Sequence, residues 1–375
     1  MKDNTKKEEP GLQEISFAVF GAKNSGKTTM LAAYYGSQQT DAFCREHGYY
    51  FSADSTTDGN ELLAKFHRLE DGIFPPSSPD LHEYVFSFFV DGLAEPSFRV
   101  RWMDYPGGWW EREPRDMAEK ADRDAALHRL LNCHACIFLI DGEKYLSEGM
   151  TYVRTSLDQF RNEGRKIQQA FSELNESSDW PQNWIIGLSK ADLLSPKITA
   201  EDISKDILKG ASDSISGLSK ILNDESLGHK VLLLASVKTK RNKIVDPFNH
   251  IGFNVLAPAV LLANIQQVRD RMPEGKGMDV AKRVTFGVRK IFSFIDKLDD
   301  FLPKKYQVIS ILLDALQIDD ILDKQTEYFR KRQEKAVRKK QILEAGIEAL
   351  KAQLASEEAR RVYHQPFKSH SQVDE

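Results

Sequence analysis

Eight residues near the start of the chain have the types and spacing that hold a chain of phosphates. Gly21 to Thr28 read GAKNSGKT, between an apolar run at 15–20 and a helical stretch at 27–35. The glycines let the backbone turn tightly, so that successive N–H groups face one anion, and the start of the helix adds positive potential. The Lys27 ammonium would reach the terminal phosphates, and the Thr28 hydroxyl would bind Mg²⁺. The expected phosphate-binding residues are Gly21, Ala22, Lys23, Asn24, Ser25, Gly26, Lys27, Thr28 and Thr29.

A second polar motif, DYPG, follows the apolar run at 98–103. The Asp104 carboxylate could hold the water shell of a Mg²⁺ ion opposite Thr28, and the Gly107 N–H could meet a γ-phosphate and sense its presence. A plain turn is the alternative for such a short motif, but its place after a strand favours the phosphate site. We therefore expect Lys27 and Gly107 to act in the phosphoryl chemistry.

Two later strand ends have side chains suited to a purine base. Asp192, in the SKAD motif after 184–188, could accept two hydrogen bonds from the guanine N1–H and N2 amine, a pair that adenine lacks. The Lys190 stem could lie along the purine face, although a helix N-cap formed by Ser189 or Asp192 is the alternative. After 231–235, a backbone N–H could bind guanine O6. The expected base-binding residues are Ser189, Lys190, Asp192, Ser236, Val237 and Lys238.

These motifs need a scaffold that brings strand ends together, and the pattern of elements predicts one. Apolar runs alternate with helical stretches over the first 270 residues, which favours an α/β fold with a doubly wound, mostly parallel sheet. Each motif follows a strand, so all should lie at one edge of the sheet. The expected strands are 15–20, 49–53, 84–90, 98–103, 135–140, 184–188 and 231–235, and the expected helices are 27–35, 61–70, 114–131, 150–174, 200–222 and 255–271.

Taken in this order, the motifs GxxxxGKT, DxxG, SKxD and ASxK resemble those of P-loop GTPases of the Ras and translation-factor type, over about residues 11–270. Among these, the chain looks most like bacterial small-GTPase-like proteins, including those called double-GTPase proteins. The resemblance implies a nucleotide-binding fold, Mg²⁺-dependent GTP binding, and switching between GTP and GDP forms. The interval between Lys27 and Asp104 is longer than in small Ras-like proteins, which implies an inserted strand and helix near 49–71.

The sequence also departs from that family. Ser189 stands where Asn or Thr is usual, and it would hydrogen-bond to the P-loop with less reach, so guanine affinity would be modest. The first switch should precede the hairpin at 84–103, where Ser77 and Ser78 are the only hydroxyls beside a Phe-Pro-Pro segment. The family uses Thr there for Mg²⁺, so we expect one of these serines to serve, with an exposed Pro/Ser loop as the alternative.

The residues after Gly107 bear on catalysis and on partners. Gly108 and two tryptophans stand where hydrolysing relatives often have Gln, so we expect slow intrinsic hydrolysis that needs another group. Arg112 and Arg115 are nearby candidates, or they are solvated charges. Trp109 and Trp110 suit a protein-partner surface, with packing on the neighbouring helix as the alternative.

The chain changes character after residue 272, because no strand signal remains. An apolar stripe at 284–298 and another at 343–354 predict a helical extension over 278–361, which could be a coiled coil and could bind a partner helix. The expected domains are a disordered N-terminus at 1–10, a GTPase domain at 11–272, this extension, and a disordered tail at 362–375. A homodimer is left open, and we do not expect membrane contact.

The composition of the chain argues against several other classes of protein. The net charge of −4 on 375 residues argues against a nucleic-acid coat, and the three cysteines cannot form a disulfide scaffold. Cys133 and Cys136 have no second pair for zinc and should be core thiols. The first ten residues are charged and no apolar run is long enough for a membrane span, so we expect a cytoplasmic protein.

These features lead to one main hypothesis, a guanine-nucleotide switch with GTP/GDP and Mg²⁺ as its ligands. The C-terminal helices would pass the nucleotide state to a protein partner. One alternative is a P-loop ATPase motor or assembly subunit, whose sensor elements are not visible in the sequence. Another is a non-hydrolysing scaffold in which the nucleotide is structural.

Overall fold

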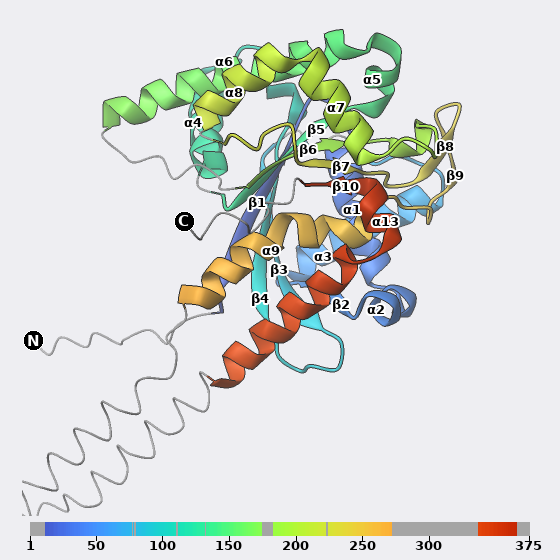
Figure 1. Cartoon of the computed structure of the whole chain (residues 1–375). Helices are drawn as coiled ribbons and strands as arrows, with labels where there is room; N and C mark the ends of the chain where they lie inside the picture. Colours follow the sequence, from blue (N-terminus) through green and yellow to red (C-terminus); the bar gives the residue numbers. More distant parts are fainter. Residues whose placement is uncertain are drawn as a thin grey trace, which may run out of the picture. The chain divides into compact units, whose positions relative to one another are not determined.

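A computed structural model describes residues 12–271 and 337–365, apart from 77, 79, 110–111, 132, 175–182 and 223. Its centre is an eight-stranded sheet with the order β10-β7-β6-β5-β1-β4-β3-β2 (Figure 1). The pairs among β7, β6, β5, β1 and β4 are parallel, while β2, β3 and β10 pair antiparallel. The strands are β1 Glu14–Phe20, β2 Tyr49–Ala53, β3 His82–Val90, β4 Phe98–Asp104, β5 Ala135–Ile140, β6 Asn183–Leu188, β7 Val231–Leu233 and β10 Tyr363–His364.

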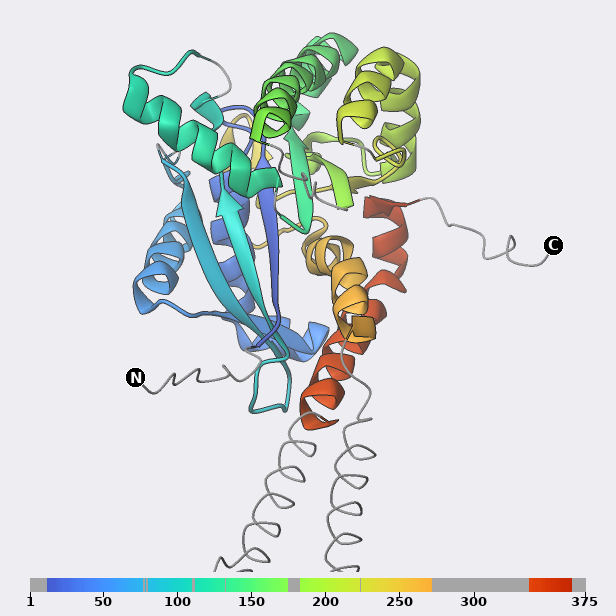
Figure 2. The same cartoon turned by 90° about the vertical axis from the view of Figure 1, so that its left-hand side faces the viewer.

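Helices cover both faces of this sheet. Figure 1 shows α4, α6 and α8 on one side and α1, α3 and α9 on the other, and Figure 2 gives the view at 90°. The helices are α1 Lys27–Gln38, α2 Asp41–His47, α3 Thr56–Glu70, α4 Met117–Leu131, α5 Gly142–Glu148, α6 Met150–Leu174, α7 Ala200–Gly210, α8 Ser212–Leu222, α9 Phe253–Arg271 and α13 Glu357–Val362. The expected doubly wound α/β fold is confirmed.

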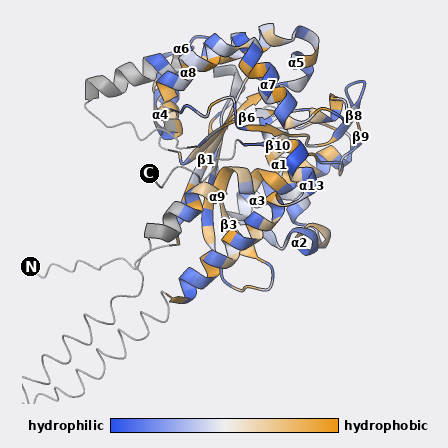
Figure 3. Ribbon diagram, in the orientation of Figure 1, coloured by the Kyte–Doolittle hydropathy of each residue, from blue (hydrophilic) through white to orange (hydrophobic). Residues whose placement is uncertain are grey.

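The burial of the strands explains why the central ones have continuous apolar sequences and those nearer the sheet edge do not. Every residue of β5 and β6 is buried, because parallel strands in the middle of such a sheet are covered on both faces, and their sequences ACIFLI and NWIIGL are almost wholly apolar. In β3 the buried positions alternate, as expected closer to a sheet edge. Hydrophilic and hydrophobic residues alternate along α6 and α8 (Figure 3), as they do in helices that pack one face against a sheet.

The sheet register sets the position of the motifs. Asp104 at the end of β4 lies opposite Val19 of β1, and Ile140 at the end of β5 lies opposite Leu188 of β6. The segments that follow β1, β4, β5, β6 and β7 therefore leave the sheet at one edge, as expected for parallel strands. The antiparallel pairing of β2 and β3 continues the sheet beyond β4, so the strand and helix expected within 49–71 are present as β2 and α3.

Several elements differ from the expected ones. The helix expected over 200–222 is two helices, α7 and α8, which are separated at Ala211. Helices α2 and α5 are short, seven residues each, and have little periodicity to find. A two-stranded hairpin, β8 Lys238–Lys240 and β9 Lys243–Asp246, was also missed, because its turn at Arg241 and Asn242 uses left-handed backbone without glycine.

The C-terminal part divides between two compact units, one of 1–268 with 345–375 and one of 269–344. Most of the second unit, and with it most of the predicted extension and coiled coil, lies outside the described residues. Tyr363 and His364, which we placed in a disordered tail, form β10 and pair antiparallel with β7. The sequence could not show this, because two residues carry no period and the strand depends on a partner far away in the chain. Within the described residues, no helix is long and apolar enough to cross a membrane.

Candidate functional site

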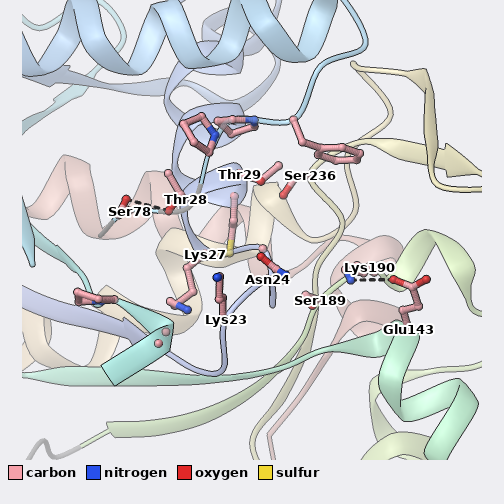
Figure 4. Close-up of a pocket in the computed structure, with 18 of the residues that line it drawn as sticks. Lys23, Asn24, Lys27, Thr28, Thr29, Ser78, Glu143, Ser189, Lys190 and Ser236 are labelled. Carbon is pink, nitrogen blue, oxygen red and sulfur yellow. Dashed lines mark hydrogen bonds and ion pairs between the residues drawn. The ribbon is translucent and has the colours of Figure 1, made fainter. Parts of the chain in front are cut away.

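A cavity of about 530 Å³ opens at the edge of the sheet where the parallel strands end, and residues from all four motifs line it (Figure 4). Its walls combine the P-loop, the segment around Pro75 and Ser78, the loop after β4, and the segments after β6 and β7. The predicted site residues among the lining are Lys23, Asn24, Gly26, Lys27, Thr28, Thr29, Ser78, Gly107, Ser189, Lys190, Asp192, Ser236 and Val237. Such crevices at strand ends are where α/β folds bind ligands.

The P-loop curls around the ammonium group of Lys27. Its Nζ donates hydrogen bonds to the carbonyl oxygens of Gly21 at 2.8 Å and Ala22 at 2.9 Å. Gly26, the N-cap residue just before helix α1, has φ of 93°, while a Cβ on Gly21 would lie 2.4 Å from the Leu139 carbonyl oxygen. Both glycines are therefore required by the backbone path. Gly21, Ala22 and Ser25 support this path but do not line the cavity.

Three oxygen-bearing side chains meet beside the P-loop. Thr28 Oγ1 donates to Asp104 Oδ2 at 2.9 Å, Ser78 Oγ donates to the same oxygen at 3.1 Å, and the two hydroxyl oxygens lie 3.1 Å apart. Ser78 is thus the described serine that reaches the expected metal position. Ser77 lies outside the described residues.

The Asp104 carboxylate is the feature that fits a cation best. Its side chain is buried, and its Oδ1 has no hydrogen-bond partner in the described structure. Burial raises the pKa of Asp104, and the charge of Lys27 and the two hydroxyl hydrogen bonds oppose that rise. A buried carboxylate oxygen without a partner is costly unless a cation or water reaches it. Hydroxyl and carboxylate oxygens are the ligands that Mg²⁺ prefers, so these residues fit that ion.

Asp192, the expected guanine reader, is held by a residue that we did not predict. Its Oδ2 accepts hydrogen bonds from the Thr239 backbone N at 2.8 Å and from Thr239 Oγ1 at 2.7 Å. Thr239 lies on β8, and it lines the cavity together with Asn242 of the same hairpin. No spacing in the sequence marks Thr239, because its role depends on how the hairpin folds back towards Asp192.

Two other side chains of the SKAD motif, those of Lys190 and Ser189, also form hydrogen bonds within the protein. Lys190 Nζ donates to Asp141 Oδ2 and Glu143 Oε2, both at 2.9 Å; Figure 4 shows the contact with Glu143. Burial lowers the pKa of Lys190, but these hydrogen bonds and charges outweigh it and the pKa is raised. Ser189 Oγ donates to the Ile140 carbonyl oxygen at 3.2 Å, not to the P-loop as we expected. Its short side chain reaches only the adjacent strand.

Only part of the ASVK motif lines the cavity. Ser236 and Val237 line the cavity, whereas Lys238 is exposed at the start of β8 and does not. His250 Nδ1 lies 2.7 Å from the Ser236 carbonyl oxygen and so donates to it, which ties the motif to the chain beyond the hairpin. Burial lowers the pKa of His250, so the neutral imidazole is favoured there.

Gly107 packs directly against the P-loop. A Cβ at this position would lie 2.5 Å from the Lys23 backbone nitrogen and 2.6 Å from the Ala22 carbonyl carbon. Only glycine therefore allows the segment after β4 to approach the phosphate-binding backbone so closely. Trp109 follows in a short 3₁₀ turn, with the guanidinium of Arg123 5.9 Å from its ring centroid, while Trp110 lies outside the described residues.

Cys133 and Cys136 are buried in the core. Burial raises the pKa of Cys133 to about 12, which suits a buried thiol and not a reactive one. In the part of the chain that the structure describes, no group of three or more His, Cys, Asp or Glu side chains could hold a metal ion.

The comparisons with known proteins agree with this arrangement. In sequence, the family described as Double-GTPase 2 matches residues 15–223. No curated protein matches the chain.

The solved structures that match the chain have low sequence identity and low TM-scores. The signal recognition particle receptor SRb-GTP/SRX complex of Chaetomium thermophilum is 15% identical with a TM-score of 0.32, covering 62% of this chain and 94% of that one. The G domain of the T. maritima FeoB iron transporter is 13% identical with a TM-score of 0.24, covering 60% and 88%. The GTP-bound Ski7 GTPase-like domain of S. cerevisiae is 16% identical with a TM-score of 0.28, covering 60% and 42%.

The family match spans more than half of the chain and contains the P-loop, the DYPG motif and the SKAD motif that line the cavity. The chain therefore belongs to the Double-GTPase 2 family of P-loop GTPases.

Proposed function

We propose that this protein is a guanine-nucleotide switch, which binds GTP with Mg²⁺, hydrolyses it slowly and signals its state to a protein partner. The observation that carries the proposal is one cavity that is lined by Lys27, Asp192 and the hydroxyl residues Thr28 and Ser78. Both hydroxyls donate to Asp104, which is not itself a lining residue. Phosphates, a cation and a guanine base would each find a matching group there.

The residues divide the work by position. The P-loop N–H groups and Lys27 would hold the phosphates, and Lys27 would leave the Gly21 and Ala22 carbonyls for them. Thr28, Ser78 and Asp104 would hold Mg²⁺, which when bound neutralises the charge that develops on the phosphate oxygens. Gly107 packs on the P-loop backbone, where its N–H would sense the γ-phosphate.

Asp192 would give the preference for guanine. Thr239 occupies its Oδ2 and leaves Oδ1 to accept from the base, while Lys190, fixed by Asp141 and Glu143, would lay its stem beside the purine. Adenine offers no matching donors, so ATP would leave this carboxylate without a partner.

The partner would read the loops that change with the nucleotide. These are the segment around Ser78 and the loop that carries Trp109 and Trp110, with the C-terminal helices as a second contact. Trp109 is only partly buried against Arg123, so part of its ring remains open to a partner.

The experiment compares GTP and ATP binding by calorimetry, with and without EDTA, for wild type, Asp192→Ala and Lys27→Ala. Wild type should prefer GTP and lose affinity when Mg²⁺ is removed, Asp192→Ala should lose the preference, and Lys27→Ala should not bind. Equal affinity for GTP and ATP would favour the alternative hypothesis of a P-loop ATPase motor or assembly subunit. Tight GTP binding without single-turnover hydrolysis, even with candidate partners, would favour the hypothesis of a non-hydrolysing scaffold in which the nucleotide is structural.

A further inference from the structure

Three arginines converge on one carboxylate next to the loop that follows Gly107. Glu119 of α4 accepts from Arg112 NH1 at 3.0 Å and NH2 at 2.5 Å, from Arg123 NH2 at 3.0 Å, and from Arg115 Nε at 3.3 Å. The Arg115 backbone N donates to it as well, at 2.7 Å. This arginine cluster, Arg112, Arg115, Glu119 and Arg123, carries more positive than negative charge beside a cavity suited to phosphates.

The three arginines are not equivalent. Arg123 is 9% exposed and donates to the Trp109 and Arg112 carbonyl oxygens at 2.7 Å each, so it fixes the shape of the loop, and it does not line the cavity. Arg112 and Arg115 both line the cavity. Arg115 uses only Nε and its side chain is 73% exposed, whereas Arg112 presents both terminal nitrogens as a fork.

A guanidinium fork recognises a carboxylate and a phosphate through the same two parallel hydrogen bonds. Glu119 is therefore an acceptor that the oxygens of a bound phosphate could replace. The Arg112 side chain is 38% exposed and so has room to change partner. The loop also lacks a carboxamide after Gly107, so this segment offers no side chain of that type to orient the attacking water. The charged side chains from it that line the cavity are Arg112 and Arg115, and a guanidinium can stabilise charge on a transferring phosphate.

We propose that Arg112 is a catalytic residue of this GTPase, which transfers its fork from Glu119 to the phosphate oxygens of GTP during hydrolysis. The inference rests on the proposed function. Water attacks the γ-phosphorus, the bond to the β–γ bridging oxygen breaks, and GDP and phosphate leave. Arg112 stays protonated throughout and only stabilises the developing charge. Because Glu119 competes for the same fork, turnover without a partner is slow.

The test measures single-turnover GTP hydrolysis, affinity for GDP, and affinity for GDP with aluminium fluoride, an analogue of the transferring phosphate. Arg112→Ala should lower the hydrolysis rate and the analogue affinity by about 100-fold, with GDP affinity changed less than about twofold. Arg112→Lys keeps the charge without the fork and should recover part of the loss. Glu119→Gln weakens the competing acceptor and should raise the rate.

Arg129→Ala is the matched control, because Arg129 lies on α4, the helix that carries Glu119, pairs with Glu83 and does not line the cavity. It should behave as wild type. A wild-type rate and analogue affinity in Arg112→Ala, or a loss in Arg115→Ala instead, would overturn the assignment while leaving the proposed function standing. A lower hydrolysis rate in Glu119→Gln, with normal GDP affinity, would show that Glu119 does not compete with the phosphate oxygens for Arg112. If wild type neither binds nor hydrolyses GTP, both proposals fall together.

Discussion

The two carboxylates that we propose for cation and base binding are each held by a hydroxyl from a distant part of the chain. Asp104 accepts from Thr28 and Ser78, and Asp192 accepts from Thr239. These bonds fix which way an oxygen points before any ligand arrives, and a pre-oriented group loses less entropy on binding. Selectivity at the level of single residues therefore depends on supporting hydroxyls as much as on the carboxylates.

We predict that Thr239→Val weakens GTP binding by about 10- to 100-fold, because it removes a hydrogen bond to a charged group worth about 1.5–3 kcal/mol. Thr239→Ser keeps the hydroxyl and should stay near wild type. Inosine triphosphate lacks the N2 amine, so its binding should fall less. Calorimetric titration with both nucleotides checks this, and equal losses for the two would show that Thr239 supports the fold and not the reading of guanine.

At the scale of elements, helices α1 and α3 approach each other closely because a glycine stands at the contact. Gly36 of α1 faces Phe66 of α3, and a Cβ on Gly36 would lie 2.1 Å from Phe66 Cγ and 2.7 Å from its Cβ. These atoms belong to the buried base of the ring, which cannot move aside cheaply. The contact positions α1, and with it the P-loop at its start.

We predict that Gly36→Ala destabilises the protein by about 1–2 kcal/mol, because overpacking outweighs the gain in helix propensity. In a Phe66→Ala background the clash is gone, so the same change should be neutral or stabilising. Urea unfolding of the four proteins in this double-mutant cycle gives the change in unfolding free energy that Gly36→Ala causes in each background. Stabilisation by Gly36→Ala in the wild-type background would contradict the packing argument.

At the scale of the whole molecule, the chain returns to the GTPase unit after leaving it. Residues 345–365 belong to that unit, where β10 extends the sheet beside β7, and Gln353 and His47 are joined by two hydrogen bonds. Ile347 and Leu350 are buried. The nucleotide-binding unit is therefore completed by the C-terminal segment, and the 269–344 unit is connected to it covalently at both ends.

We predict that Leu350→Ala lowers the free energy of unfolding by about 2–5 kcal/mol, the usual cost of a large-to-small change in a core. Lys351→Ala, at a neighbour whose side chain is 42% exposed and pairs only with the exposed Glu348 among the ion pairs of the described residues, should change it by less than about 0.5 kcal/mol. Thermal melts followed by circular dichroism measure both. A Leu350→Ala melt like that of wild type would mean that this segment is not part of the cooperative unit.

Much of the fold could be predicted because its signals are local. The fully apolar runs at β5 and β6 and the glycines of the P-loop are read directly along the chain, since burial on both faces and tight turns select residue types one by one. Lys27, Asp104 and Asp192 were found for the same reason, because Asp104 ends the strand β4, Lys27 begins the helix after β1, and Asp192 lies in the short segment after β6.

The sequence by itself determined that each motif follows a strand of a mostly parallel sheet, and therefore that the motifs meet at one edge of it. Only the tertiary structure decided that Thr239 holds Asp192, that Glu119 gathers three arginines, that Ser189 turns to Ile140, and that Tyr363 and His364 become a strand. Those features depend on which distant groups come within hydrogen-bonding reach, and a hydrogen bond leaves no periodic trace in the chain that forms it.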